Sequence, residues 1–232
     1  MLAVVVLAAC GTGPEPYASR AGPTVVAFGD SVPAGTACGC RPFPVLYARL
    51  LAPDGHSVNL AKSGYTSADV RSQLATPVAR AAVRTADVLI VMIGANDIGD
   101  ALGAGRGNTA YAKVADQVQR NVTAIVTTIR ALRPAPVLVI GYWNVAEDGD
   151  VGLADYGADG LADAISATTY VDDALVRAAA ATGARYVDTT TAFKGGSGEE
   201  DPTDLLAPDG DHPNANGHRA IAAAAYAAQP TG

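Results

Sequence analysis

Two short stretches of this chain combine residue types that catalyse acyl transfer. DGDHP at residues 209–213 puts a carboxylate three residues before an imidazole, and FGDS at residues 28–31 puts a serine after an apolar run. A carboxylate at this spacing can share one turn with the histidine and orient its ring, which can then take a proton from a serine delivered by the fold. Ser31, His212 and Asp209 are therefore the predicted nucleophile, base and orienting carboxylate of a hydrolase.

Two segments between these stretches could supply hydrogen-bond donors to the same site. NLAKSG at residues 59–64 could present the Gly64 backbone N–H, and GAND at residues 94–97 could present the Asn96 side-chain amide. Attack on an ester carbonyl creates a negatively charged oxygen. Each donor fixed around that oxygen lowers the barrier by about 3 kcal/mol in known acyl-transfer sites.

The order of these blocks resembles a known family. With Ser31, Gly64, Asn96 and His212 in this sequence, the chain resembles the SGNH subgroup of the GDSL esterases and lipases over about residues 24–226. The resemblance implies a serine esterase that needs no cofactor. It also implies an oxyanion hole made by the backbone N–H groups of the serine and the glycine and by the asparagine amide.

Other acidic residues and a second histidine lie in or near these motifs. The family pattern D-x-x-H favours Asp209 over its rival Asp211 as the partner of the histidine. Asp30 and Asp97 are interpreted as residues that brace loops, and His218 as a structural partner on the last helix.

Apolar runs alternate with helical patterns along the chain, which is typical of a parallel sheet with crossover helices. The expected strands are residues 24–28, 57–61, 88–93, 137–142 and 185–188. The expected helices are residues 43–51, 68–83 with Ser67 as the cap, 108–132, 161–182 and 214–228. The predicted fold class is α/β, a three-layer α/β/α sandwich of flavodoxin-like type with a five-stranded parallel sheet.

This topology predicts where the site lies. In open parallel sheets, ligands bind outside the carboxyl ends of the strands. Ser31, Gly64 and Asn96 each follow a predicted strand. We therefore expect three distant segments to meet at one edge of the sheet.

Composition limits the partners. The 232 residues are 49% hydrophobic and 17% charged, with a net charge of −7. This suits one domain, predicted at residues 24–229, and argues against nucleic acid, which is held mainly by clustered Lys and Arg. Acidic membrane surfaces are disfavoured for the same reason.

The first ten residues are interpreted as a signal peptide with a lipobox. Residues 1–9 are apolar, and LAA precedes Cys10, which would be lipidated and anchored to the membrane. Residues 11–23 would form a flexible tether. The alternative is an ordinary signal peptide cut after the alanines, although no Lys or Arg precedes the apolar stretch. Either way we expect an extracytoplasmic protein, a cell-membrane lipoprotein or a secreted one.

Cys38 and Cys40 leave two interpretations open. They could form a disulfide, or they could be two small, partly buried side chains at the rim of the site. No metal site is expected, because two thiols do not complete a tetrahedral zinc site and the histidines show no ligand spacing.

The substrate class is less well determined than the chemistry. Residues 144–160 could wall the pocket, and their acidity argues against negatively charged substrates, so small neutral acyl esters fit best. A glycan O-acetyl esterase is the alternative enzyme. A rival from another class is a non-catalytic surface lipoprotein that binds glycan or lipid.

Overall fold

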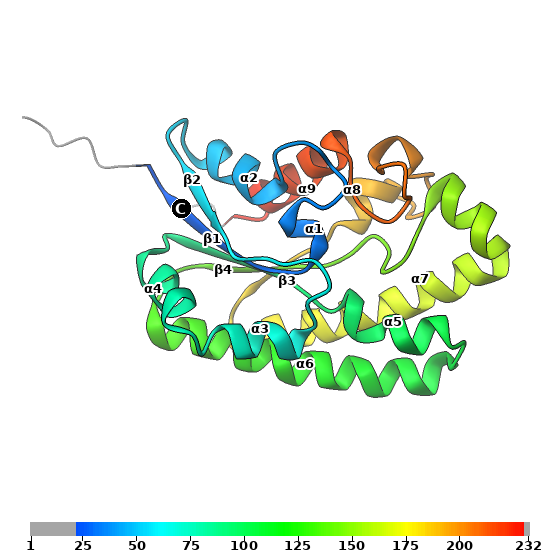
Figure 1. The fold of residues 1–232 in the computed structure, drawn as a ribbon, viewed down its shortest axis with the longest axis horizontal. Coiled ribbons are helices and arrows are strands. Elements are labelled where there is room, and N and C mark those ends of the chain that lie inside the picture. The colour runs from blue at the N-terminus through cyan, green and yellow to red at the C-terminus, as the bar shows by residue number, and fades with distance from the viewer. Residues whose placement is uncertain (1–21, 230–232) are drawn as a thin grey trace, which may run out of the picture.

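The computed structural model describes residues 22–229, which form an α/β fold around one parallel sheet (Figure 1). The sheet has five strands in the order β2-β1-β3-β4-β5, and every pairing is parallel. The strands are β1 (Thr24–Gly29), β2 (His56–Asn59), β3 (Val88–Met92), β4 (Val137–Ile140) and β5 (Arg185–Val187). The predicted fold class and all five strand positions are confirmed. Cys10 and the predicted signal peptide lie outside the described residues.

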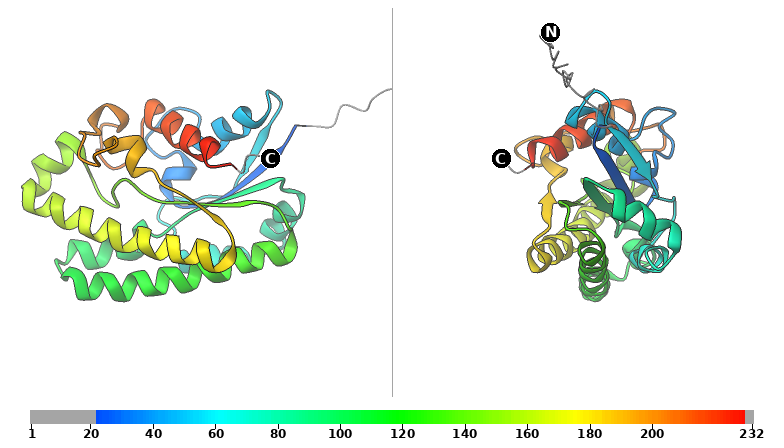
Figure 2. Two further views of the ribbon diagram at one scale, coloured as in Figure 1. Left: turned by 180° about the vertical axis from the view of Figure 1, so that it is seen from behind. Right: turned by 90° about the vertical axis from the view of Figure 1, so that its left-hand side faces the viewer.

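Helices cover both faces of the sheet (Figure 2). One layer holds α1 (Ser31–Ala34), α2 (Phe43–Leu51), α8 (Thr190–Lys194) and α9 (Ala215–Ala227). The other layer holds α3 (Ser67–Gln73), α4 (Pro77–Thr85), α5 (Ala95–Gly103), α6 (Gly107–Leu132) and α7 (Gly149–Thr182), and a short 3₁₀ turn, η1, spans Thr203–Leu205. Among residues 22–229, no helix is long and apolar enough to cross a membrane.

The buried core explains why the strands form where they do. The central strands β1, β3 and β4 consist almost entirely of buried apolar residues, as strands covered on both faces should. In the layer that holds α3 to α7, the long helices α6 and α7 pack along each other. The helix α6 buries an apolar stripe that includes Val118, Val122, Ile125 and Ile129. The three-layer arrangement therefore follows from the apolar pattern.

The prediction of a single helix at residues 68–83, capped by Ser67, is wrong in two respects. It is divided into α3 and α4, because Pro77 cannot continue a helix but fits the first position of a new one. The cap is Thr66 rather than Ser67: its hydroxyl accepts from the Asp69 N–H while the Asp69 side chain accepts from the Thr66 N–H. Ser67 is the first residue of α3 and is buried.

Residues 144–160, which are expected to wall the pocket and are not among the predicted helices, are largely helical. The α7 helix begins at Gly149, where the Asp148 side chain accepts from the Gly149 N–H, and it is interrupted at Gly157, whose φ of 66° is not helical. Glycine tolerates this left-handed geometry and so permits the bend. The helix α5, which directly follows β3, also has no counterpart among the predicted helices.

Candidate active site

The predicted site residues gather at the carboxyl edge of the sheet, as expected. Ser31 begins α1 directly after β1, Gly64 lies in the loop after β2, and Asn96 lies in the first turn of α5 after β3. Asp209 and His212 lie in the loop between η1 and α9. Four segments that are far apart in sequence therefore converge on one region.

The turn that carries Ser31 is held from three sides. Asp30 caps α1, because its side chain accepts from the Val32 N–H at 3.2 Å. The Asn59 amide donates to the Pro33 carbonyl at 2.7 Å. Gly29 has φ of 154°, and a Cβ there would lie 2.1 Å from the Met92 carbonyl oxygen, so only glycine fits.

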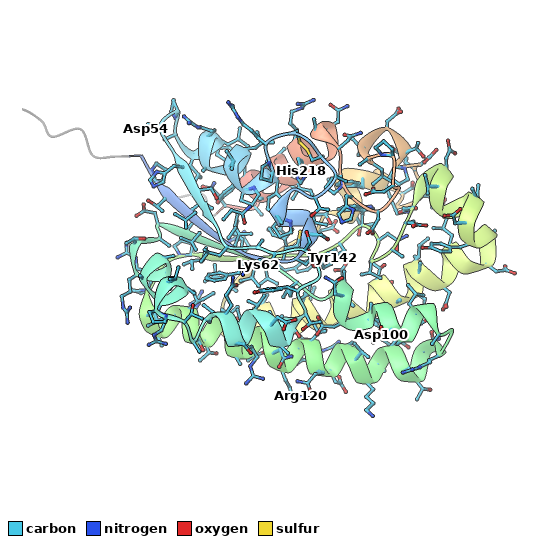
Figure 3. The ribbon with its side chains drawn as sticks, in the orientation of Figure 1. Asp54, Lys62, Asp100, Arg120, Tyr142 and His218 are labelled. Carbon is cyan, nitrogen blue, oxygen red and sulfur yellow. A yellow bond between two sulfur atoms is a disulfide. The ribbon has the colours of Figure 1, made fainter. Side chains whose placement is uncertain are left out.

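Beneath this turn lies a buried carboxyl group. Asp30 is 1% exposed and accepts a hydrogen bond from the Tyr142 hydroxyl, which approaches from the end of β4 (Figure 3). Burial raises the pKa of Asp30 to about 7, although the bonds from Tyr142 and Val32 oppose this rise. The charges of Asp211 and His212 also act on Asp30. The prediction that Asp30 braces a loop is in agreement with these contacts.

A hydrogen bond joins the first turn of α5, which carries Asn96, to the loop that carries Gly64. The Asn96 side-chain amide donates to the Tyr65 carbonyl at 2.9 Å, which leaves its second amide hydrogen for another acceptor. Gly64 has φ of 79° and is exposed. Within residues 22–229, the backbone N–H groups of Ser31 and Gly64 donate to no protein acceptor.

Asp97 fixes the segment that carries Asn96. Its two carboxylate oxygens accept from the Ser67 N–H at 2.8 Å and from the Ser67 hydroxyl at 2.5 Å. Asn121 of α6 donates to the same hydroxyl at 2.8 Å. Burial raises the pKa of Asp97, and the Ser67 bonds work against this rise. Asp97 therefore braces α5 against α3, as the sequence suggested.

Asp209 and His212 form a direct pair. The His212 Nδ1 lies 2.8 Å from one Asp209 carboxylate oxygen, and the His212 backbone N–H donates to the other oxygen at 3.1 Å. Burial alone would raise the pKa of Asp209, but the bonds from His212 outweigh it and lower the pKa. The rival carboxylate of Asp211 lies 3.6 Å from Nδ1. The geometry therefore matches the D-x-x-H pattern.

A buried ion pair supports the loop that carries this pair. Lys194 Nζ lies 2.7 Å from the Asp148 carboxylate, and both side chains are less than 10% exposed. The Asp148 backbone N–H donates to the Gly210 carbonyl at 2.9 Å, and the Ala207 N–H donates to the His212 carbonyl at 2.7 Å. The position of His212 thus depends on residues that the sequence did not single out.

Comparison with known proteins decides the family. The model of the GDSL-like lipase/acylhydrolase family matches residues 27–220. The chain belongs to this family. It is therefore a GDSL-type serine hydrolase that acts on ester bonds. No curated protein matches its sequence significantly.

Solved structures resemble this GDSL hydrolase over most of its length. A lipase from a goat rumen metagenome has a TM-score of 0.70 at 21% identity, covering 88% of this chain and 96% of its own. Phospholipase A1 from Streptomyces albidoflavus has 0.68 at 24%, covering 90% and 100%. An acetylxylan esterase from Geobacillus stearothermophilus has 0.62 at 20%, covering 88% and 92%. These similarities support the fold.

A cavity of about 400 Å³ lies between α5 and α7 in the GDSL hydrolase. Its lining is mainly small and apolar: Gly99, Leu102, Gly103, Val145, Ala146, Tyr156, Gly160, Asp163 and Ala164. Gly99 lies one helical turn after Asn96, so the cavity begins close to the segment that carries Asn96. Residues 144–160 do contribute to its wall, as predicted.

Cys38 and Cys40 form a disulfide in the structure of the hydrolase, which selects the first of the two interpretations. They lie in the loop between α1 and α2. Their sulfur atoms and a ring nitrogen of His218 lie within 4.8 Å of one another. His218 is buried in α9, and its Nδ1 accepts from the Phe43 N–H at 3.2 Å, which agrees with the predicted structural role.

The sequence did not identify the residues that support the site through long-range contacts. Tyr142 ends a predicted strand, but its pairing with Asp30 spans 112 residues and leaves no local signal. The Lys194 and Asp148 pair is equally remote in sequence. Only the apolar surroundings of Lys194, next to Phe193, could have suggested a buried charge that needs a partner.

Proposed function

We propose that the protein is a serine esterase that hydrolyses small acyl esters through Ser31, His212 and Asp209. The observation that carries this proposal is the 2.8 Å contact between His212 Nδ1 and Asp209, in a loop at the same sheet edge as Ser31. With Nδ1–H donated to the carboxylate, the neutral ring keeps its lone pair on Nε2. That atom is then available to act as a base.

Acylation begins at the serine hydroxyl. Ser31 Oγ attacks the ester carbonyl carbon while His212 Nε2 accepts the hydroxyl proton. Asp209 holds the ring in position and stabilises the imidazolium that forms. The C–O bond to the alcohol then breaks, and His212 Nε2–H protonates the leaving alkoxide. The acyl group remains on Ser31.

Three donors are proposed to stabilise the oxyanion. They are the backbone N–H groups of Ser31 and Gly64 and the free amide hydrogen of Asn96. The first two have no protein acceptor within the described chain, and the third belongs to an amide whose other hydrogen is held by Tyr65. Because these donors are fixed before reaction, they stabilise charge at little reorganisation cost.

Deacylation repeats the chemistry with water. A water molecule attacks the acyl carbon while His212 Nε2 takes one of its protons, and His212 then gives that proton to Ser31 Oγ. The acid leaves and the enzyme is restored. No metal or cofactor takes part in this sequence.

The cavity between α5 and α7 is proposed to receive one part of the substrate. Its volume of about 400 Å³ falls within the range of small-molecule sites, and its glycine-rich apolar wall suits an acyl chain or a small alcohol. An acetylated glycan remains the alternative substrate, since one structural neighbour is an acetylxylan esterase. Small chromogenic esters can test the acyl group in both cases, because only the alcohol part of the substrate differs.

The test compares Ser31→Ala with wild type on acetyl, butyryl and octanoyl chromogenic esters. We expect Ser31→Ala to lose on the order of 10⁴-fold in kcat. The matched control is Ser72→Ala, an exposed helix serine whose hydroxyl bonds only the Ala68 carbonyl, and it should keep full activity. Equal rates of product release in wild type and Ser31→Ala contradict the proposal. If both rates equal the uncatalysed rate, the protein is a binder, and if both exceed it, another nucleophile acts.

We also propose that Cys10 carries a lipid anchor, which rests on the LAA-Cys sequence alone. In a bacterial host, Cys10→Ser should release the protein from membranes into the soluble fraction. Unchanged fractionation of Cys10→Ser contradicts the anchor. The catalytic proposal is independent of this outcome.

A further inference from the structure

We propose that Cys38 and Cys40 form a reversible thiol–disulfide exchange site, in which His218 Nε2–H stabilises a cysteine sulfur when the bond opens. We further propose that opening loosens the loop next to Ser31. The first part stands apart from the esterase chemistry. The second rests on the proposed function.

The buried histidine is the observation that points to the sulfurs. His218 is 0% exposed, and its Nδ1 accepts from the Phe43 N–H, so the neutral ring carries its proton on Nε2. That Nε2 is buried without a hydrogen-bond partner in the described protein. A buried donor without a partner is costly. The two sulfur atoms lie within 4.8 Å of a ring nitrogen of this histidine (Figure 3).

The same three side chains do not suit a metal. A metal-binding histidine normally donates its other ring N–H to an acceptor. Here the other nitrogen, Nδ1, accepts from the Phe43 N–H instead, so a metal at Nε2 would have to displace the proton that this tautomer requires. Burial lowers the pKa of His218 to about 4, and the charge of His212 adds to this effect. The neutral ring therefore offers the sulfurs a donor.

The position of the disulfide in the sequence makes it easy to open. The two cysteines are two residues apart, and a bond that closes so short a loop removes little entropy from the unfolded chain. Both cysteines are partly exposed, so a small thiol can reach them. Accessible disulfides of this kind are the labile ones.

Opening the bond needs a dithiol reductant. One thiolate of the dithiol attacks a cysteine sulfur, which forms a mixed disulfide and releases the other cysteine as a thiolate. The second thiol then attacks the reductant's own sulfur, closes the reductant's disulfide and releases the second cysteine. Two electrons pass to the protein, and the two dithiol protons end on the cysteine sulfurs or in solvent.

Two polar groups near the sulfur atoms can form hydrogen bonds with the reduced cysteines. The Arg41 carbonyl oxygen lies 3.6 Å from Cys40 Sγ and can accept a hydrogen bond from the Cys40 thiol. The His218 Nε2–H can donate to the thiolate of the other cysteine, which lowers the free energy of the reduced form. The structure therefore holds partners for both products of reduction.

The loop connects this bond to the proposed nucleophile. The N–H groups of Gly35 and Thr36 both donate to the Ser31 carbonyl at 3.1 Å, and the Thr36 hydroxyl lies 2.5 Å from the Ser63 hydroxyl, beside Gly64. Ala37, directly before Cys38, has φ of 58°, in the left-handed region that is unfavourable for an alanine. Once the bond opens, Ala37 can leave this conformation and shift the contacts to Ser31 and Ser63.

The first experiment measures the exchange equilibrium. The folded full chain is equilibrated with mixtures of reduced and oxidised dithiothreitol, alkylated, and the peptide with both cysteines is quantified by mass spectrometry, which separates it from Cys10. We expect His218→Asn, whose amide oxygen can still accept from Phe43, to need at least about a threefold higher ratio of reduced to oxidised dithiothreitol for half reduction. His218→Gln extends an amide donor toward the sulfurs and should restore the wild-type midpoint. Equal midpoints in all three proteins, or a pair that stays oxidised in native protein, overturn the proposal.

A second measurement needs no variant. The imidazole ¹⁵N signals of His218 in wild type should report a proton on Nε2, and the Nε2–H signal should move when Cys38 and Cys40 are reduced. A proton on Nδ1, a signal that does not respond to reduction, or stoichiometric Zn²⁺ binding by the reduced protein each contradicts the role given to His218. These readouts do not depend on esterase activity.

The coupling to catalysis is tested last. We expect dithiothreitol to lower kcat/KM of wild type several-fold toward the value of Cys38→Ser/Cys40→Ser, with recovery on reoxidation, while the double variant does not respond. An oxidised and a reduced wild type of equal kcat/KM refute the coupling. A chain without any esterase activity refutes the proposed function, and the exchange equilibrium still decides the first part.

Discussion

His212 is bound to Asp209 twice, once through its ring and once through its backbone. Nδ1 lies 2.8 Å from one carboxylate oxygen, and the backbone N–H donates to the other at 3.1 Å. Asp209 therefore fixes both the side chain and the turn that carries it. Asp211, at 3.6 Å from the same Nδ1, makes no such second bond to His212.

This asymmetry distinguishes the two carboxylates in an experiment. Asp209→Asn should lower kcat by on the order of 10³–10⁴-fold, because an amide can donate to Nδ1 and select the wrong tautomer. Asp211→Asn should change kcat less than tenfold. Steady-state kinetics on a butyryl ester compare the two variants, and a larger loss in Asp211→Asn reverses the assignment.

Asn96 offers a test of the oxyanion site. Asn96→Ala removes the amide proposed to face the oxyanion, and we expect kcat to fall about 10²–10³-fold with little change in KM, because this donor acts mainly in the transition state. The matched control is Asn108→Ala, an exposed asparagine at the start of α6. A change in KM alone would show that Asn96 binds substrate rather than the oxyanion.

The strands could be predicted from the sequence, but some helices could not. The central strands β1, β3 and β4 are short apolar runs with nearly all their residues buried, a pattern that needs no partner to be recognised, whereas most residues of the edge strands β2 and β5 are at least partly exposed. The break before Pro77 was readable from proline chemistry, since its ring excludes it from a helix interior. The start of α7 at Gly149 was not, because its first turns are rich in glycine and aspartate and are held by the distant Thr203.

The sequence also predicted one part of the candidate site and not the other. The motif residues could be predicted because each directly follows a strand or lies within one turn of its partner, as Asp209 does with His212. The supporting contacts could not, since Tyr142 with Asp30 and Lys194 with Asp148 pair across 112 and 46 residues of chain. Long-range pairs leave no periodic signal, so only the folded chain reveals them.

The Lys194 and Asp148 pair should matter to both stability and activity. Lys194→Met leaves the Asp148 charge buried and unpaired, which typically costs about 3–5 kcal/mol. Urea unfolding should show this loss, and kcat should fall because the Gly210 carbonyl loses a fixed donor at Asp148. Adding Asp148→Asn to Lys194→Met removes the uncompensated charge and should recover part of the stability. No recovery in the double variant contradicts the charge argument.

Gly103 lets the cavity be filled without a clash. A Cβ at Gly103, in the wall of the cavity, meets nothing within 4 Å. Gly103→Leu should lower kcat/KM for an octanoyl ester at least about tenfold and change that for an acetyl ester less than threefold, since a few lost methylene contacts are worth that much. Gly196→Leu, at another open glycine away from the cavity, is the control. Equal effects on both esters would show that the acyl chain lies elsewhere.

Two buried carboxyl groups should make stability fall as pH rises. Burial raises the pKa of Asp30 and of Asp172 to about 7 each, above the ordinary 3.8. Between about pH 4 and pH 7 the folded protein keeps protons that the unfolded chain has released, so the free energy of unfolding decreases with pH, by up to about 1.4 kcal/mol per unit for each group. Below pH 4 both states are protonated and this contribution is fully present. Above pH 7 it is lost.

Asp30→Asn isolates one of these groups. The amide copies the neutral acid, because its oxygen can accept from Val32 and its NH₂ can donate to the Tyr142 oxygen. Urea unfolding between pH 4.5 and 7.5 should therefore give Asp30→Asn a shallower fall in stability than wild type, with the difference growing toward pH 7. The exposed loop variant Asp54→Asn serves as control. A wild-type slope in Asp30→Asn would mean that Asp30 is already ionised in the folded protein, and the Tyr142 hydroxyl would then be donating to a carboxylate.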